Sequence, residues 1–232
     1  MKQLHCQVAS IEALTPAVFR VLLELPEAIR FAGGQYLQVV MGERDKRPFS
    51  IASCPSKTDT LELHIGAADD NPYAREVLQK MRTDKAITVE VPLGDAWYRE
   101  DSERPLILIA GGTGFSYTWS ILQDHLRKDD SRPVTLYWGG RKADDLYFDT
   151  KLQDLSERHP QFCYRPVIEE AQAGWHGAVG LVHHAVLAEQ GALTDADVYV
   201  AGRFEMVRCI RDDFQSRGLP PGQLYGDALA FI

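Results

Sequence analysis

Five short apolar segments alternate with helical segments over the second half of the chain, and this rhythm constrains the fold more than any other feature. The apolar segments are expected to be strands at residues 105–111, 134–139, 162–167, 197–202 and 224–228. The helices between them are expected at about 117–127, 149–159, 181–189 and 204–217. Such an alternation predicts a five-stranded parallel sheet with right-handed crossovers, flanked by helices.

The first half has a different rhythm. Segments rich in β-branched and aromatic residues, bounded by Gly and Pro, predict strands at 18–25, 36–41, 61–65 and 87–92. The alternation of apolar and polar residues over 61–65 predicts a strand with one buried face. Short antiparallel strands of this kind predict a small β-barrel.

One helix is expected in this half, from Pro72 to about Arg82, with Asp70 or Asn71 as its cap. The chain is therefore expected to be a two-domain β + α/β protein. An antiparallel β-barrel with one helix occupies residues 1–102, and the α/β domain occupies residues 103–232.

Charge and cysteine content exclude several classes of protein. The 232 residues carry 25 Lys and Arg against 33 Asp and Glu, which argues against a nucleic-acid or anionic-membrane surface. The four cysteines form no C-x-x-C pair, as expected for reduced thiols in the cytoplasm. No apolar run approaches the roughly 20 residues that span a bilayer. Neither nucleic acid nor a membrane is an expected partner.

The first strand of the α/β half ends in a glycine-rich turn. Ligands of open parallel sheets bind beyond the carboxyl ends of the strands, and a following helix N-terminus suits a pyrophosphate. Tyr117 stands where the dinucleotide fingerprint would have its third glycine, so a tight turn without a ligand is the alternative. The turn consists of Gly111, Gly112, Thr113, Gly114, Phe115 and Ser116.

Two other strand ends carry candidate residues. Arg141 follows the second strand, and its guanidinium could bind a ribose 2′-phosphate, although Asp144 and Asp145 make a solvated loop charge an equal alternative. The fourth strand ends in a second glycine turn, for which an ordinary turn is again the alternative. This turn is formed by Ala201, Gly202, Arg203 and Phe204.

The barrel half contains the tetrapeptide Arg47-Pro48-Phe49-Ser50. Arg47 can bind a phosphate, Pro48 stiffens the segment, and the Ser50 hydroxyl can both donate and accept. By composition alone the start of a strand is the simpler interpretation. The pair His183-His184 has no Cys or second His pair near it in sequence, so no metal site is predicted.

Taken together, these motifs resemble the ferredoxin–NADP reductase superfamily, and within it the bacterial NAD(P)H:flavin oxidoreductases that reduce free flavins. The resemblance runs in order through essentially the whole chain. It is carried by AGGQYL (32–37), RPFS (47–50), HIGA (64–67), PLGDAW (92–97), LIAGGTGFS (108–116), LYWGGR (136–141), DLYF (145–148), VYVAGRFEM (198–206) and YGDALAFI (225–232).

The resemblance implies a flavin site in the barrel half. Ser50 would be the catalytic residue, with its hydroxyl hydrogen-bonded to flavin N5, and Arg47 would face the flavin phosphate or ribityl chain. The segment His64-Ile65-Gly66-Ala67 would line the ring and side chain, and Phe231 would supply a terminal aromatic. The flavin-binding residues implied are Tyr36, Arg47, Pro48, Phe49, Ser50, His64, Ile65, Gly66, Ala67 and Phe231.

The resemblance also implies an NAD(P)H site at residues 111–116, 141 and 201–204, with Thr113 near the nicotinamide. Domain apposition would stack nicotinamide on flavin. Ala201 stands where many relatives have Cys, which should alter rate without forbidding hydride transfer. No segment after Gly66 cradles an adenine, so the flavin would be a weakly held substrate.

The expected activity is reduction of riboflavin, FMN or FAD by NADH or NADPH. The alternative is a flavoprotein that retains FAD or FMN and passes electrons to a protein or ferric chelate. A non-enzymatic nucleotide-sensing module is a more distant alternative. A flavin-dependent monooxygenase, a luciferase or ferric iron is a possible downstream acceptor.

Overall fold

The computed structural model describes residues 1–128, 131–191 and 193–232. The chain divides into two compact units, and each is described by itself below. Unit 1 consists of Met1–Tyr98 and Trp119–Asp124, and unit 2 of Arg99–Thr118 and His125–Ile232. Throughout this described part of the chain, no helix combines the length and apolar character needed to cross a bilayer.

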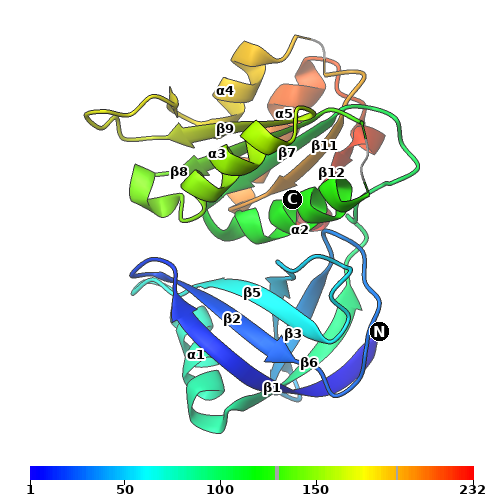
Figure 1. Ribbon diagram of the computed structural model, residues 1–232, viewed down its shortest axis with the longest axis vertical. Coiled ribbons are helices and arrows are strands. Elements are labelled where there is room, and N and C mark those ends of the chain that lie inside the picture. Colours follow the sequence, from blue (N-terminus) through cyan, green and yellow to red (C-terminus); the bar gives the residue numbers. More distant parts are fainter. Residues whose placement is uncertain (129–130, 192) are drawn as a thin grey trace. The chain divides into compact units, whose positions relative to one another are not determined.

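Unit 1 is built on a six-stranded antiparallel sheet that curls into a half-barrel (Figure 1). In spatial order the strands are β4 (Asp45–Ser50), β3 (Tyr36–Gly42), β6 (Ala86–Leu93), β1 (Lys2–Ala13), β2 (Val18–Glu24) and β5 (Thr60–Gly66). Just beyond β4, the Ala52 amide donates to the Glu62 carbonyl at 2.7 Å. This bond joins the two edges of the curled sheet, and the predicted antiparallel barrel architecture is confirmed.

The sequence prediction missed the strand β1, which pairs with both β2 and β6. Its inward residues Leu4 and Cys6 are buried, while Lys2, Gln3 and His5 are exposed. The alternation is therefore present, but it is carried by few apolar residues and lacks the β-branched richness that marks the other strands.

The helix α1 (Pro72–Asp84) lies against β1, β5 and β6. Asn71 caps it, because its side-chain oxygen accepts from the Ala74 amide at 3.2 Å, and Pro72 occupies the first turn as expected. Lys85 ends the helix in the left-handed conformation at φ 55°. One face of α1 enters the core of unit 1 through Ala74, Val77, Leu78 and Met81.

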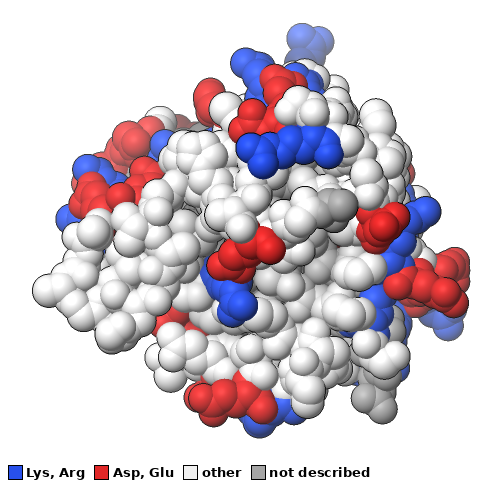
Figure 2. Space-filling model, turned by 90° about the horizontal axis from the view of Figure 1, so that it is seen from above, with Lys and Arg blue, Asp and Glu red and all other residues white. Residues whose placement is uncertain are grey.

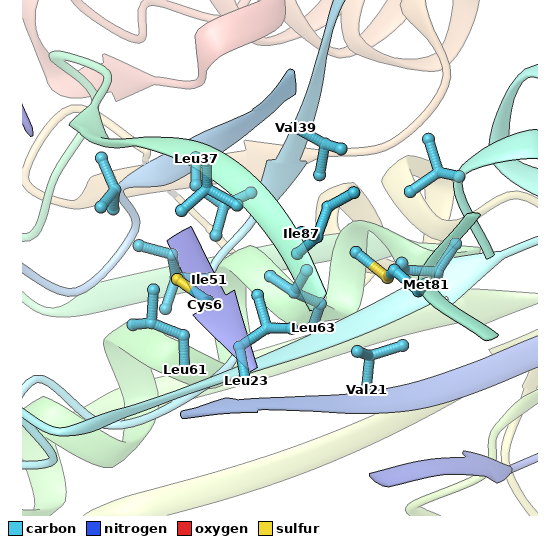
Figure 3. Packing of buried hydrophobic residues seen from close by; sticks show 14 of the residues in the cluster. Cys6, Val21, Leu23, Leu37, Val39, Ile51, Leu61, Leu63, Met81 and Ile87 are labelled. Atoms are coloured by element: carbon cyan, nitrogen blue, oxygen red, sulfur yellow. The ribbon is translucent and has the colours of Figure 1, made fainter. Parts of the chain in front are cut away.

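The core of unit 1 is a single apolar cluster inside the curled sheet. Figure 3 shows Cys6, Leu23, Leu63 and Ile87, from four different strands, directed toward one interior together with Met81 of α1. Fully burying an aliphatic side chain contributes about 1.5–3 kcal/mol, so this cluster is the main stabilising element of the unit.

Unit 2 contains a six-stranded parallel sheet (Figure 1). In spatial order its strands are β10 (Ala178–Val179), β9 (Phe162–Ile168), β8 (Val134–Gly140), β7 (Leu106–Gly111), β11 (Asp197–Ala201) and β12 (Leu224–Tyr225). The helices α3 (Asp149–Arg158), α4 (Val182–Glu189) and α5 (Phe204–Ser216) belong to unit 2, as do the two ends of α2 (Phe115–Arg127), whose residues Trp119–Asp124 are counted in unit 1. The parallel sheet flanked by helices is confirmed.

The sheet has one strand more than expected, because the two-residue strand β10 adds to the edge of β9. A strand this short leaves no periodic signal in the sequence. At the opposite edge, β12 ends at Tyr225 rather than residue 228, and a 3₁₀ turn at Asp227–Phe231 follows. Apolar residues of α4 and α5 share one core with the strands, including Val186 and Ile210.

A buried ion pair stabilises this sheet at the amino-terminal ends of its strands. Arg132 Nη2 lies 2.7 Å from Asp197 Oδ2, and both side chains are almost fully buried. Arg104 approaches the other oxygen of Asp197 at 3.4 Å. The guanidinium of Arg132 also donates to the Arg99 carbonyl at 3.1 Å. Because both charges are removed from water, the loss of one partner would leave the other uncompensated.

Candidate functional site

Ser50 is the last residue of β4, and it pairs across the ladder with Tyr36, the first residue of β3. Both side chains are half-buried. Among the described residues, none hydrogen-bonds the Ser50 hydroxyl. Two predicted flavin-binding residues therefore meet at one end of the hairpin, with a hydroxyl that can donate to or accept from a ligand.

Arg47, in the same strand, is buried and surrounded by acceptors. Its Nε and Nη2 atoms donate to the two carboxylate oxygens of Asp45 at 2.9 and 2.6 Å. Nη2 also lies 2.7 Å from Glu76 Oε2, and Nη1 donates to the Tyr73 carbonyl at 2.6 Å. The guanidinium stacks over the Tyr73 ring, 4.3 Å from its centroid. The hydrogen bonding of Arg47 to the Asp45 carboxylate is the main cause that raises the pKa of Arg47.

These contacts change what Arg47 can do for a ligand. Two carboxylates balance its charge, and most of its donors are occupied by Asp45, Glu76 and Tyr73. A flavin phosphate at Arg47 would have to displace or approach these acids, which oppose a second negative charge. The sequence did not reveal Glu76, because it lies on α1, far from the tetrapeptide in the chain.

β5 is buried on both of its faces. The alternation of apolar and polar residues over 61–65 predicted that only one face would be buried. Leu61, Leu63 and Ile65 face the core, as expected. Glu62 and His64 on the other face are also buried, at 6% and 4% exposure. The one-face expectation is therefore wrong, because periodicity shows which residues share a face but not whether that face is covered.

The second face of β5 carries a charge network. His64 Nε2 lies 2.9 Å from Glu62 Oε1, and Arg20 Nη2 of the neighbouring strand donates to Glu62 Oε2 at 2.8 Å. Burial acts to raise the pKa of Glu62, but the bonds from His64 and Arg20 outweigh it and lower the pKa to about 2. Glu62 is therefore a carboxylate at neutral pH that holds the His64 ring in place.

Residues within unit 1 cover this network. The Ser53 hydroxyl accepts from the Glu62 amide at 3.1 Å, and Ser120 donates its hydroxyl to the Ser53 carbonyl at 2.8 Å. The side chain of His64 is inaccessible to solvent. A ligand contact by the His64 ring stays a prediction, and the structure assigns the ring a packing role in β5.

The other predicted flavin residues differ in exposure. Pro48 is exposed and Phe49 is half-buried, whereas Ile65 belongs to the core. The Gly66 carbonyl accepts from the Asn71 side chain at 3.0 Å, and Ala67 packs against the core. The segment that was expected to line a flavin thus also connects β5 to the cap of α1.

In unit 2, the glycine turn after β7 forms a 3₁₀ turn, Gly112–Gly114, before α2 begins at Phe115. Gly112 has φ +53° and a Cβ there would meet nothing within 4 Å. Gly114, in contrast, approaches β11 so closely that a Cβ would lie 2.2 Å from the Ala201 carbonyl oxygen. Gly114 is therefore required for packing, and Gly112 provides an open, strained turn beside half-buried Thr113.

The next two residues of the turn are buried. Phe115 stacks on Trp138 with ring centroids 3.9 Å apart, so its side chain belongs to the core of unit 2. Ser116 is 2% exposed, and its hydroxyl finds no hydrogen-bond partner in the described part of the chain. The Ser116 hydroxyl therefore has hydrogen-bonding capacity that a ligand could use.

Arg141 follows β8 and is exposed, but it is not free. Its Nε donates to Glu170 Oε1, and Lys142 Nζ lies 3.6 Å from the other oxygen of Glu170. The hydrogen bond that Arg141 donates to Glu170 is the main cause that raises the pKa of Arg141. The sequence prediction missed Glu170, which lies just beyond β9, although neighbouring parallel strands end at the same edge of a sheet.

The turn after β11 brings together residues predicted for the NAD(P)H site and for the flavin site. Met206 fills the space between two strand ends, because a Cβ on Gly111 or on Gly202 would lie 2.5 Å from its Sδ or Cε atom, respectively. Phe204 and Phe231 are both exposed, and their ring centroids are 6.3 Å apart. Ala201 is half-buried and Arg203 is exposed. The contact of Phe231 with a flavin stays a prediction.

Charged residues of both signs are interspersed over the face shown in Figure 2, and no broad basic surface is visible there. The candidate sites therefore consist of small sets of neighbouring residues and not of an extended charged surface. In unit 1 these are Ser50, Tyr36 and the acid-balanced Arg47. In unit 2 they lie at the carboxyl ends of β7, β8 and β11.

Comparison with known proteins supports the NAD(P)H-dependent flavin reduction that was expected from the sequence. Residues 108–212 match the family described as Oxidoreductase NAD-binding domain. The chain is 46% identical to proteins named NAD(P)H-flavin reductase from Aliivibrio fischeri and from Vibrio harveyi, over 99% of this chain and 99% of each relative.

A solved ferredoxin NADP+ reductase from Neisseria gonorrhoeae, with bound FAD and NADP, has a similar fold. The TM-score is 0.78 at 23% identity, over 94% of this chain and 92% of that one. The full-length identity to the two relatives identifies the family: this chain belongs to the NAD(P)H-flavin reductases.

Proposed function

We propose that this protein reduces free flavins with NADH or NADPH. Unit 1 binds the flavin and unit 2 binds the pyridine nucleotide, with the predicted boundary between residues 102 and 103. The nicotinamide supplies a hydride, and the flavin ring accepts it at N5. The observation that carries the proposal is the 46% identity, over 99% of both chains, to two proteins named NAD(P)H-flavin reductase.

Ser50 is the residue to which we assign a catalytic role. Its hydroxyl stands at the end of β4 with no hydrogen-bond partner among the described residues, and Tyr36 lies directly opposite. The hydroxyl would hydrogen-bond N5, and this bond contributes most where it is stronger in the transition state than in the ground state. Arg47 would contribute less to phosphate binding than its motif implies, because Asp45 and Glu76 balance its charge.

The groups available in unit 2 suit a pyridine nucleotide. Gly112 leaves open space at the end of β7, and the buried Ser116 hydroxyl beside it lacks a partner within the described residues. Both lie at the N-terminal end of α2, where backbone amides favour a phosphate. Arg141 and Glu170 offer a cation and an acid at the end of β8, which could bind a 2′-phosphate and a ribose hydroxyl, respectively.

A flavin-retention and turnover assay tests the proposal. After gel filtration the protein should be colourless and should oxidise NADH or NADPH only when riboflavin, FMN or FAD is added. A yellow protein that oxidises NADPH with a ferric chelate and no added flavin would instead favour a retained prosthetic group. Absence of turnover with both nucleotides and all three flavins would contradict the proposal.

We place the protein in the cytoplasm, where NAD(P)H is supplied and where its four free cysteines stay reduced.

The use of the reduced flavin is a further part of the proposal. The reduced flavin would diffuse to an acceptor such as a flavin-dependent monooxygenase, a luciferase or ferric iron. Ferric reduction that needs both NAD(P)H and added flavin would support this order of steps, and reduction without flavin would contradict it.

A further inference from the structure

Two histidines and an aspartate meet on the side of unit 2 formed by α4 and α5. His183 and His184 lie in the first turn of α4, and Asp213 lies near the end of α5. One possible ligand atom from each residue lies within 4.8 Å of the other two. The sequence showed only the histidine pair, for which no metal site was predicted, and the fold supplies the third group.

The hydrogen bonding of His183 indicates that this cluster lacks a component. His183 is only 6% exposed, and its Nδ1 has no hydrogen-bond partner in the described part of the chain. Its Nε2 is directed toward Asp213 Oδ2 at 3.5 Å, longer than an ordinary hydrogen bond. Buried polar groups are normally satisfied, so a buried imidazole whose Nδ1 has no partner among the described residues calls for a further partner.

The donor set identifies the chemistry of that partner. Two imidazole nitrogens and one carboxylate oxygen are ligands typical of zinc and of neighbouring divalent transition metals. With metal–ligand distances of about 2.0–2.1 Å, tetrahedral ligand atoms lie about 3.4 Å apart. The 3.5 Å between His183 Nε2 and Asp213 Oδ2 already approaches this spacing. His184 is exposed and can rotate inward, since its ring lies 4.3 Å from that of His183.

The composition of the cluster also suits a cation. Asp213 places a carboxylate group beside two imidazole rings, and its possible ligand atom lies within 4.8 Å of one nitrogen of each ring.

We propose that His183, His184 and Asp213 bind a divalent transition-metal ion of the zinc class, which links α4 to α5. Three protein ligands leave at least one coordination position for water. Because α4 and α5 share an apolar core with the sheet, the ion would stabilise unit 2. The proposal is independent of flavin reduction, since none of the three residues belongs to the predicted flavin or nucleotide sites.

The test is direct binding of Zn²⁺ to the full chain. The protein is treated with a chelator, desalted and titrated with Zn²⁺ by calorimetry, and Co²⁺ is then added as a spectroscopic probe. We expect saturable binding of one ion, visible Co²⁺ absorption typical of four or five ligands, and a Tm rise of about 5 °C at a hundredfold excess over Kd.

Variants identify the ligands. Each of Asp213→Asn and His184→Gln should weaken Zn²⁺ binding at least about tenfold, given that loss of even an outer-shell partner costs roughly 10–100-fold. Asp212→Asn is the matched control, because Asp212 is exposed and pairs with Arg211 on the same helix. His183→Gln is the third ligand variant, and its Tm without metal shows whether it still folds.

Three results would overturn the proposal. One is no saturable binding of Zn²⁺ by the wild type. Another is equal affinity in Asp213→Asn and Asp212→Asn. The third is binding that survives Asp213→Asn but disappears in Cys209→Ser, because Cys209 is an exposed thiol on α5 and could bind zinc by itself.

Discussion

Arg47 Nη2 lies 2.7 Å from Oε2 of Glu76, a residue of α1 that the sequence gives no reason to associate with the Arg47 motif. Together with the two hydrogen bonds that Arg47 donates to Asp45, this contact makes the guanidinium a charge-balanced group. Its capacity to bind a flavin phosphate is therefore limited by its own neighbours, and this limitation can be tested.

Glu76→Gln should improve the use of phosphorylated flavins. Glu76 is largely exposed, and exposed ion pairs contribute at most about 1 kcal/mol. The ratio of KM for FMN to KM for riboflavin should therefore fall by about two- to fivefold. Glu27→Gln, which removes an exposed acid paired with Lys2, is the control and should leave the ratio unchanged. An unchanged ratio in Glu76→Gln would show that Arg47 does not face the phosphate.

Ser50→Ala should lower kcat by about ten- to a thousandfold, as expected for loss of one transition-state hydrogen bond. Steady-state turnover with saturating NADH and riboflavin measures the effect. Ser56→Ala is the matched control, because its exposed hydroxyl bonds only Cys54 Sγ at 3.2 Å. Near-normal kcat in a Ser50→Ala protein with wild-type circular dichroism would remove Ser50 from the mechanism.

Arg141 and Glu170 should act in opposite directions on nucleotide preference. Arg141→Ala should raise KM for NADPH about tenfold with little effect on NADH, because it removes a charged donor from the 2′-phosphate. Glu170→Gln should lower KM for NADPH, because it removes the negative charge that balances the guanidinium and opposes a 2′-phosphate.

The comparison requires a control for general loss of positive charge. Arg211→Ala serves this purpose, since Arg211 pairs with Asp212 on α5. Parallel changes in KM for NADH and NADPH in the Arg141 variant would indicate that Arg141 does not distinguish the two nucleotides.

Glu62→Gln should lose stability in a pH-dependent manner. The pKa of Glu62 falls from 4.5 to about 2 on folding, so its carboxylate stabilises the folded chain fully above pH 4.5. This contribution, about 3 kcal/mol, is lost as the pH falls from 4.5 toward 2. The difference in free energy of unfolding between wild type and variant, from urea titrations, should shrink over that range.

Glu12→Gln provides the comparison, because Glu12 also approaches Arg20, at 3.7 Å, but is exposed. Its effect should be below about 1 kcal/mol at every pH. A pH-independent difference for Glu62→Gln would mean that the bonds to His64 and Arg20 do not hold Glu62 in its charged form.

Asp197→Asn should destabilise the protein by about 3–5 kcal/mol, because it leaves Arg132 buried without its counter-ion. Thermal unfolding should show a fall in Tm of about 6–20 °C. Asp195→Asn removes an exposed acid from the same loop and should change Tm little. Similar Tm values for the two variants would show that the buried pair adds no stability.

Local patterns predicted much of the fold. The alternation of apolar and helical segments indicated five of the six strands of the parallel sheet and the helices α2 to α5. For the cap of α1 the sequence left Asp70 and Asn71 open, and the structure shows that Asn71 is the cap. The strands β1 and β10 were missed, and of β4 only Arg47–Ser50 was expected, as the start of a strand and not as its end. β1 has few apolar residues, and β10 has only two residues in all.

The sequence by itself determined most of the elements and the glycine turns, because helix and strand periodicity and turn preferences act over a few neighbouring residues. The residues expected to carry hydride-transfer chemistry were indicated by the resemblance of the motifs to a known family. The tertiary structure decided which charges meet. Glu76 reached Arg47, Glu170 reached Arg141, and Asp213 reached His183 only through the packing of distant elements. Such pairings depend on strand order and on which faces are covered, and no local pattern records either.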